Sequence, residues 1–367
     1  MKRLITLLVA LPMLFSACGK GPEPFIIPET DKTEEPEKDT EEPLLPADPP
    51  AGTVIVGYAV SWESRLPDPK LLTHINYAFS LIKNDFETLD IQNAGRLSQI
   101  AGLKKTKPGL KVLLSIGGWG AGNFSEMAAS EKHRKAFCQN CLAAVKKYGL
   151  DGIDIDWEFP TSSSAGISSS PDDTKNFTLL MRDLRQALGK DRLLTMASSA
   201  GAGYVVFKDI VQYLNFVNIM TYDMASPPGH NSPLYHSANS WISCDESVSA
   251  HHAAGVSYDK IVMGIPFYGH GDGKAYAGYV DFKDIPALNE SLYTVQWDEA
   301  AQVPYIADAS GKMVFSYDDA RSVGLKADYI LQKKLAGAMY WNIEADDASF
   351  TLGKAVASHL NVTDFKP

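Results

Sequence analysis

Three carboxylic acids at alternating positions mark the segment DGIDIDWEFP, which covers residues 151–160. Successive side chains of a β-strand point to opposite faces, so Asp154, Asp156 and Glu158 share one face of a predicted strand. Acids stacked this closely cannot all be ionised, and we expect them to share protons and to titrate as a coupled unit. Such a group is suited to general acid–base catalysis.

The position of these acids argues against a purely structural role. A lone acid at the end of a strand often caps a helix or pairs with a surface lysine, but this does not explain three acids on one inward face. A buried carboxylate without a partner costs several kcal/mol or takes up a proton. We therefore expect a raised pKa for Glu158, at the carboxyl end of the strand, as a general acid requires.

Short apolar segments recur along the chain between segments of helical period, which predicts repeated βα units and a parallel sheet. Eight such strands would close into an α/β fold, the TIM (β/α)8 barrel, whose active sites lie at the carboxyl ends of the strands. A doubly wound open sheet is the alternative, but no G-x-G-x-x-G turn follows the first strand. The predicted strands cover residues 54–60, 73–80, 111–117, 152–158, 193–199, 216–222, 260–268 and 336–342.

Helices are expected between these strands. Residues 130–149 and a segment after Asp172 and Asp173, the candidate N-caps, keep one apolar face, and Gly189 marks the end of the second helix. The connection from 269 to 335 is longer than the usual few residues, so we expect a small insertion and a following helix beside the barrel mouth.

The two ends of the chain differ in composition from its centre. Residues 1–18 have a basic start, a short apolar run and a small-residue end, which predicts a secretory signal rather than a membrane span. The end resembles the bacterial lipoprotein box, with Cys18 as the lipidated residue and Phe15 where the pattern prefers Leu. An ordinary cleaved signal is the alternative.

Residues 19–50 carry ten acidic residues, three lysines and eight prolines, which predicts an extended, disordered tether. The catalytic domain is then expected over residues 51–367. The formal net charge of the whole chain is −10, and no basic cluster suits nucleic acid. We therefore expect no nucleic-acid partner, and membrane contact through a lipid anchor only.

The acidic strand resembles the signature D-x-x-D-x-D-x-E of the family 18 glycoside hydrolases, the chitinase family. Asp151 and the three inward acids match it in full, and SIGG at 115–118 matches the S-x-G-G signature. The resemblance runs from about residue 54 to about residue 360. One departure is His270, where the family often has Arg. Further matching elements are Tyr77–Phe79, Met220–Asp223, Gly264–Gly269 and Tyr340 with Trp341.

The resemblance implies a retaining, substrate-assisted mechanism. Glu158 would protonate the glycosidic oxygen while the sugar's own 2-acetamido group attacks the anomeric carbon. Asp156 would orient that group and stabilise an oxazolinium intermediate. Tyr222 and Asp223 would hold the acetamido group, and Trp341 would form the hydrophobic floor.

Other inward or aromatic residues complete the predicted site. Tyr58 and Ser115 have inward parity and can donate hydrogen bonds to Asp154, although each could instead have a backbone partner. Met220 also faces inward, and aromatic side chains suit the apolar faces of sugars. Trp157 has helix-facing parity, and Trp62 and Trp241 lie in loops to which we assign no role. The aromatic residues predicted to add stacking surface are Phe79, Trp119 and Trp297.

The resemblance also implies cis non-proline peptide bonds, for which 78–79, 158–159 and 341–342 are the candidates. No metal or cofactor is implied, because His251 and His252 lack acidic ligands at metal spacing. Cys138 and Cys141 lie in a predicted helix, where core packing is favoured over a disulfide or metal site.

The function expected is cleavage of β-1,4-linked N-acetylglucosamine in chitin or chitooligosaccharides by an exported, lipid-anchored monomer of the bacterial cell envelope. An endo-β-N-acetylglucosaminidase acting on N-glycan cores is the alternative within the enzyme class. A glycan-binding lipoprotein without catalysis is the alternative from another class, and the presence of Glu158 disfavours it.

Overall fold

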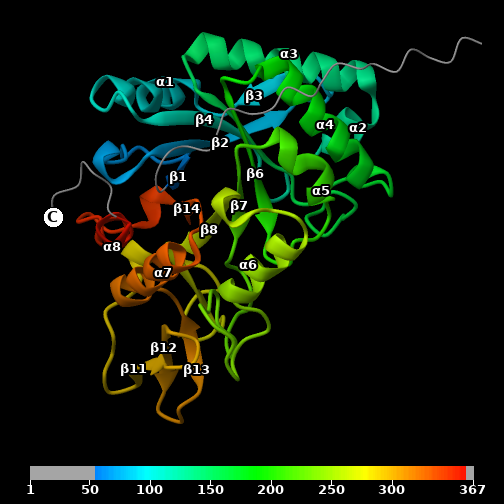
Figure 1. The fold of residues 1–367 in the computed structure, drawn as a ribbon. Helices are drawn as coiled ribbons and strands as arrows, with labels where there is room; N and C mark the ends of the chain where they lie inside the picture. Colours follow the sequence, from blue (N-terminus) through cyan, green and yellow to red (C-terminus); the bar gives the residue numbers. More distant parts are fainter. Residues whose placement is uncertain (1–53, 361–367) are drawn as a thin grey trace, which may run out of the picture. The chain divides into compact units, whose positions relative to one another are not determined.

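The computed structural model describes residues 54–360, and the predicted signal, Cys18 and the tether lie outside the described residues. Eight parallel strands form a closed barrel, because β1 pairs with both β14 and β2. The eight-stranded TIM barrel expected from the sequence is confirmed (Figure 1). The barrel strands are β1 (Val54–Val60), β2 (His74–Ile82), β4 (Lys111–Gly117), β5 (Gly152–Asp156), β6 (Leu193–Ser199), β7 (Phe216–Met220), β8 (Ile261–Pro266) and β14 (Gly337–Trp341).

Helices cover the outside of the barrel, with α1, α3 and α4 over the half built from the first strands (Figure 1). The ends of α3 and α4 follow the predicted signals, since both are followed by glycines with positive φ, Gly149 and Gly189. Asp172 occupies the N-cap of α4, but its side chain makes no capping hydrogen bond. The helices are α1 (Ala94–Gly102), α2 (Phe124–Ala129), α3 (Glu131–Tyr148), α4 (Asp173–Leu188), α5 (Phe207–Ile210), α6 (Cys244–Ala253), α7 (Ala320–Lys333) and α8 (Thr351–His359).

Short elements complete the connections. The strand β3 (Leu89–Ile91) pairs antiparallel with β2 at its carboxyl end. Single 3-10 turns lie in several of the connections. These turns are η1 (Pro69–Leu71), η2 (Leu103–Lys105), η3 (Val211–Tyr213), η4 (Tyr258–Lys260), η5 (Phe282–Asp284) and η6 (Ile343–Ala345).

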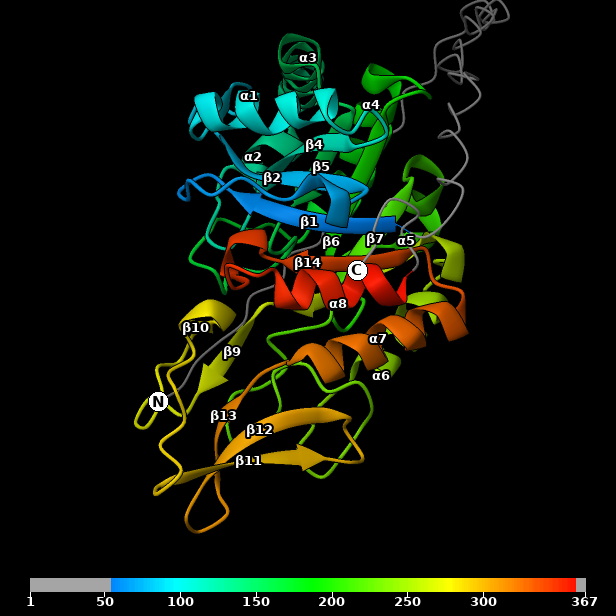
Figure 2. The ribbon, with the colours of Figure 1, turned by 90° about the vertical axis from the view of Figure 1, so that its left-hand side faces the viewer.

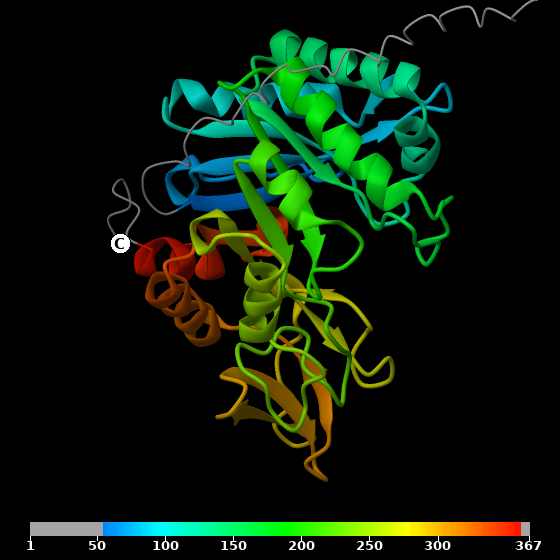
Figure 3. The same ribbon diagram turned by 45° about the vertical axis from the view of Figure 1, so that its right-hand side comes forward.

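The segment between β8 and α7 folds as an antiparallel sheet in the order β10-β9-β13-β12-β11. Figure 2 shows this sheet beside the barrel, with β11, β12 and β13 farthest from it, and Figure 3 shows the same separation from another side. The helix α7 then returns the chain to β14. The strands of the insertion are β9 (Tyr268–Gly271), β10 (Val280–Asp281), β11 (Tyr293–Asp298), β12 (Val303–Asp308) and β13 (Met313–Ser316).

The alternation of β5 divides its side chains between two cores. Trp157, which follows β5, packs outward with its ring stacked on Phe124 at a centroid distance of 5.2 Å. Asp154 and Asp156 point into the barrel and are 0% and 4% exposed. The interior also contains an apolar cluster that includes Val56, as barrel interiors usually do. The acids therefore share the interior with apolar side chains and with buried neutral polar groups such as Asn218.

Candidate active site

Four hydrogen-bond donors surround the carboxylate of Asp154. Tyr58 Oη and Ser115 Oγ each lie 2.8 Å from Oδ2, as the inward parity of their strands predicts. Thr195 Oγ1 and Asn218 Nδ2 lie 2.6 Å and 3.2 Å from Oδ1. Burial raises the pKa of Asp154, and the four donors oppose that rise by stabilising the ionised form.

Asp156 lies one step nearer the barrel mouth and has fewer hydrogen-bond donors around its carboxyl group than Asp154. Its Oδ1 is buried and has no hydrogen-bond partner within the described residues. Burial, with the nearby Glu158 and Asp154 carboxylates, raises the pKa of Asp156 well above its usual value. An oxygen of this kind can accept a hydrogen bond from a ligand that enters the cavity.

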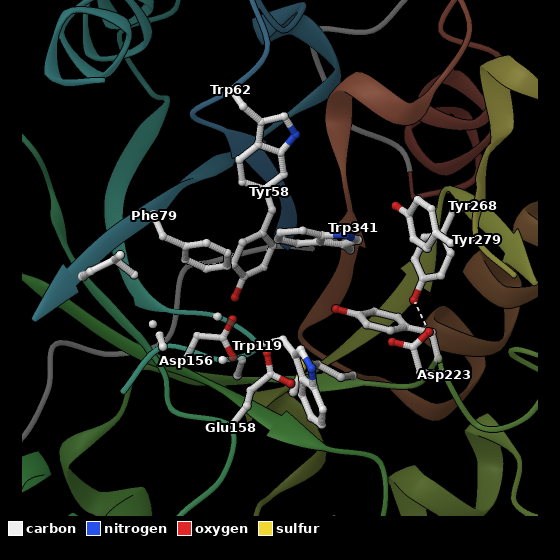
Figure 4. Close-up of a pocket in the computed structure, with 18 residues that line it drawn as sticks. Tyr58, Trp62, Phe79, Trp119, Asp156, Glu158, Asp223, Tyr268, Tyr279 and Trp341 are labelled. Carbon is white, nitrogen blue, oxygen red and sulfur yellow. Dashed lines mark hydrogen bonds between the residues drawn. The ribbon is translucent and has the colours of Figure 1, made fainter. Parts of the chain in front are cut away.

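Glu158 is partly buried at the rim of the cavity. Burial raises its pKa to about 7, and the negative charge of Asp223 contributes to the rise. The side chain is therefore protonated over the acidic range and can lose its proton near neutrality. Figure 4 shows Glu158 and Asp156 side by side, with both carboxyl groups on the cavity. A pKa near neutrality at a group that faces the cavity is the property that a general acid requires.

Two glycines bring the end of β4 against these acids. Gly117 has a φ of 126°, and a Cβ there would lie 1.9 Å from the carbonyl oxygen of Asp156. Gly118 has a φ of 95°, and its Cβ would meet the ring of Phe79 at 2.6 Å. The S-x-G-G segment thus lets two neighbouring strand ends and an aromatic ring approach more closely than side chains allow.

Aromatic rings form the floor and one wall of a cavity of about 450 Å³. Phe79 stacks with Trp341 at a centroid distance of 5.6 Å and an interplanar angle of 18°. Tyr58 lies at the same distance from Trp341, tilted by 53°. A cavity with flat apolar rings and a few carboxyl groups suits a ligand that has both apolar faces and polar edges.

The loop after β7 supplies a third acid. Asp223 has a φ of 56°, and its Oδ1 lies 2.7 Å from both Tyr268 Oη and His270 Nε2. Burial lowers the pKa of His270, but its hydrogen bond to Asp223 raises it above the usual value overall. His270, the departure from the family pattern, therefore contacts the acid that faces Glu158. Met220 and Tyr222 line the same cavity.

The structure gathers most of the predicted site residues, but not all of them. Trp119 lines the cavity and is 65% exposed. Ser115 is fully buried beneath the cavity, where it supports Asp154 and cannot contact a ligand directly. Trp297 does not line the cavity, so its predicted role as a stacking surface is not supported. It lies on β11, and the Arg321 guanidinium covers its ring at 3.6 Å.

Two further aromatic residues line the cavity without having been predicted. Trp62, in the loop after β1, has no role predicted from the sequence, but it lines the cavity, is 65% exposed and lies 6.5 Å from Trp341. Tyr279, from the insertion, stacks on Tyr268 at 4.5 Å. Nothing in the strand pattern could have identified either residue, because both lie in loops. Trp157 is buried against helices, as predicted.

The remaining sequence features have structural explanations. The peptide bonds 78–79, 158–159 and 341–342 are all cis, as expected. Cys138 and Cys141 are buried, free thiols in α3, which agrees with core packing. His251 is buried, and its Nε2 lies 2.9 Å from Ser198 Oγ.

Residues 54–360 contain neither a group of side chains suited to a metal ion nor a helix suited to a membrane. No cluster of three or more His, Cys, Asp or Glu residues in this range has the arrangement to hold a metal ion. In the same range, no helix has both the length and the apolar character needed to cross a bilayer.

Comparisons with known proteins match the same region. The model of glycosyl hydrolases family 18 matches residues 54–346. Chitinase A1 of Niallia circulans is 36% identical over 393 residues, which cover 80% of this chain and 56% of the relative. Chitotriosidase-1 of Mus musculus is 34% identical over 335 residues, or 79% of this chain and 70% of the relative. The chain thus spans little more than half the length of the first of these relatives.

Solved structures give the same result. A family 18 N-acetylglucosaminidase from Paenibacillus barengoltzii superposes with a TM-score of 0.77 at 36% identity, covering 84% of this chain and all of that one. A group IV chitinase from Ostrinia furnacalis, solved with allosamidin, gives a TM-score of 0.76 at 30% identity. In that case 83% of this chain and 98% of the other are covered.

Proposed function

The chain belongs to the glycosyl hydrolases family 18, and we propose that it hydrolyses β-1,4-linked N-acetylglucosamine in chitin or chitooligosaccharides. The observation that carries the proposal is the pairing of Glu158, whose pKa is about 7, with the unsatisfied buried carboxyl of Asp156. Both groups open on a cavity floored by Trp341. The chitinases among the relatives support this choice of substrate.

In the proposed reaction, one sugar lies on Trp341 with its 2-acetamido group against Asp156. Glu158 gives its proton to the glycosidic oxygen, and the C–O bond to the leaving sugar breaks. The acetamido carbonyl oxygen bonds to the anomeric carbon, which forms an oxazolinium ion. The free Oδ1 of Asp156 accepts the N–H of the acetamido group and stabilises the positive charge.

The second half of the reaction uses the same acid as a base. After the leaving sugar has gone, ionised Glu158 takes a proton from a water molecule that attacks the anomeric carbon. The carbon–oxygen bond of the ring intermediate breaks, and the acetamido group is restored. Two inversions leave the product in the β configuration. Tyr222 and Asp223 hold the acetamido group during both steps, and both line the cavity.

The test is Glu158→Gln, which keeps the shape of the side chain but removes the proton donor. Cleavage of a defined chitooligosaccharide should fall by at least about 10³-fold, while its binding affinity measured by calorimetry stays within a factor of a few. Glu290→Gln, at an exposed position of the insertion, is the matched control and should have normal activity. Equal turnover by Glu158→Gln would refute the assignment.

Two other functions are separated by simple assays. An endo-β-N-acetylglucosaminidase would release glycans from a glycoprotein and leave chitooligosaccharides intact. A glycan-binding protein without catalysis would bind chitooligosaccharides and cleave neither substrate. Glu158 disfavours the second alternative, because the acid required for cleavage is present.

We also propose that the protein is exported as a lipid-anchored monomer of the cell envelope, through Cys18. The support is the sequence pattern of residues 1–18 followed by an acidic, proline-rich segment. Cys18→Ser should abolish the partition of the full chain into the membrane fraction of the cell. Recovery of this variant in the membrane fraction would contradict lipidation at Cys18.

A further inference from the structure

A second hollow continues the catalytic cavity past its Trp341 floor. Its volume is about 350 Å³, and it shares Trp62, Tyr279 and Trp341 with the cavity. Polar side chains complete the lining, among them Glu63 and Asp281. A glycan that lies on Trp341 can therefore extend into this hollow without leaving an aromatic surface.

The side chain of Lys283, from η5, links two acids that line the second hollow. Its Nζ lies 3.5 Å from Glu63 Oε1 and 3.3 Å from Asp281 Oδ2, and it donates a hydrogen bond of 3.0 Å to the carbonyl oxygen of Glu344. We call these four groups the Lys283 brace. They tie together the loop after β1, the insertion and η6, which are three separate parts of the chain.

A third hollow begins on the other side of the Lys283 brace. Its volume is about 430 Å³, and Lys283, Glu344 and Arg65 are among the residues that line it. It shares Glu63 with the second hollow but contacts neither Trp62 nor Tyr279. The Lys283 side chain therefore lies between residues of the second hollow, Glu63 and Asp281, and Glu344 of the third.

The brace combines several interactions around one ammonium group. Each exposed ion pair contributes little alone, but Lys283 has two carboxylates and a carbonyl oxygen as acceptors. A neutral sugar offers hydroxyl oxygens as acceptors but no negative charge. Burial lowers the pKa of Lys283, but the carboxylates of Asp281 and Glu63 raise it above its usual value overall, so the side chain stays charged. A sugar chain that passed this point would have to separate these charges without supplying new ones.

The direction of the bound glycan follows from the proposed function, on which this inference rests. The bond breaks at the anomeric carbon of the sugar over Trp341, and that sugar stays bound while the reaction proceeds. The leaving sugar departs on the side of Glu158 and Trp119. Figure 4 shows Trp62 and Trp119 on opposite sides of Trp341. The second hollow therefore receives sugars toward the non-reducing end of the chain.

We propose that the Lys283 brace closes the non-reducing side of the cleft, so that the protein releases short oligosaccharides from the non-reducing ends of chitin-type chains. On the leaving-group side, Trp119 is 65% exposed, so a longer chain has room to extend past it. The product on the Trp341 side would be limited to the sugar on the floor and those that the second hollow admits.

The test follows the first cleavage of chitohexaose that carries a fluorescent label at its reducing end. Products from the Trp341 side are unlabelled, and their length is read from the labelled remainder. We expect unlabelled dimers and trimers from the parent. With Lys283→Ala, the share of unlabelled tetramers and longer products should rise about fivefold, as loss of a small cluster of exposed ion pairs would allow.

Two variants keep the result interpretable. Lys333→Ala breaks an ion pair of similar exposure, to Asp245, away from the three hollows and should leave the product lengths unchanged. The double variant Glu63→Gln with Lys283→Ala should give longer products at least as often as Lys283→Ala alone. Thermal unfolding of each variant checks that it is folded.

The outcomes distinguish the two proposals. A parent that leaves chitohexaose intact contradicts the proposed function. A parent that cleaves chitohexaose but already releases unlabelled tetramers at first contact overturns the closed end. The closed end is also overturned if the parent gives unlabelled dimers and trimers and both brace variants give products of the same lengths as the parent.

Discussion

Buried carboxylates occur in two different settings in this protein. Between α3 and α4, Asp183 is 5% exposed and meets two arginines, with Oδ2 at 3.0 Å from Arg134 Nε and Oδ1 at 2.8 Å from Arg182 Nη2. On β5, Asp156 is 4% exposed, and one of its oxygens has no partner among the described residues. The two acids are thus similarly buried, but Asp183 is paired with two positive charges and Asp156 with no positively charged side chain among the described residues.

The difference in charge compensation corresponds to a structural role for Asp183 and a role in proton transfer for the acids at the end of β5. A carboxylate matched by guanidinium groups forms charge-assisted hydrogen bonds, and Asp183 thereby holds two helices together. Burial, with neighbouring carboxylates and no cation to oppose it, raises the pKa values of Asp156 and Glu158, so protons remain available near neutrality. The absence of a cation makes this place costly for stability and suitable for proton transfer.

The strongest test of this comparison is Asp183→Ala. The substitution leaves Arg134, which is 5% exposed, buried without its partner, and the free energy of unfolding should fall by about 3–5 kcal/mol. Urea denaturation measures the change. Asp328→Ala, which removes an exposed acid of α7, is the control and should change stability little. A small loss at Asp183 would mean that the arginines are not matched to this acid.

The opposite result is expected for Asp156→Asn. The variant should lower kcat by about 10²–10³-fold, because an oriented negative charge facing the reacting group is lost. Its stability at pH 7 should be equal to or higher than that of the parent, since a carboxyl whose ionised form is disfavoured by burial is replaced by a neutral group. Initial rates on a chitooligosaccharide and urea denaturation give the two values. A loss of stability like that of Asp183→Ala would end the distinction between the two settings.

The pH dependence tests the raised pKa directly. Glu158 must carry a proton to act as an acid, so kcat/KM should fall as pH rises above about 7. Burial is the main cause of that pKa and the charge of Asp223 adds to it, so Asp223→Asn should move the fall in kcat/KM to lower pH. Rates measured across pH for both proteins decide the point. If kcat/KM falls at the same pH in both proteins, Asp223 does not raise the pKa of Glu158.

The smallest effect concerns the neutral donors. Ser115→Ala removes one of four hydrogen bonds to Asp154, and we expect a loss of about 1 kcal/mol in the free energy of unfolding. The loss should be larger at pH 7 than at pH 4, because the hydrogen bond stabilises the ionised carboxylate. Thermal unfolding at the two pH values measures it. An equal loss at both pH values would indicate that Asp154 is not ionised near neutrality.

The alternation of strands explains how much of the site could be predicted from the sequence. Inward parity identified the acids, Tyr58 and Ser115, whose hydrogen bonds to Asp154 the structure contains. Thr195 and Asn218 have the same parity and were missed, because parity alone does not say which inward residues lie at the height of Asp154. The register supplies this information, since Asp154 pairs with Thr195 across β5 and β6.

Loops and the insertion were beyond this reasoning. Trp62 and Tyr279 contact the cavity only because the loop after β1 and the insertion fold over the barrel mouth, and no local pattern encodes that approach. Trp297 was predicted for the cavity on its residue type alone, and the insertion places it under Arg321 instead. Residue type thus predicts which side chains suit a sugar, and only the tertiary fold decides which of them meet one.

The four donors around Asp154 also constrain the order in which the chain can fold. They come from β1, β4, β6 and β7, and the bond from Tyr58 crosses the barrel over 96 residues of sequence. A partly folded chain that has β5 but lacks its distant neighbours would bury a carboxylate without its donors, which is unfavourable. Long-range contacts of this kind form late and slow folding. Assembly of the acid row and closure of the barrel are therefore one cooperative event, and a fragment that ends before β7 would contain the signature acids without the environment that tunes them.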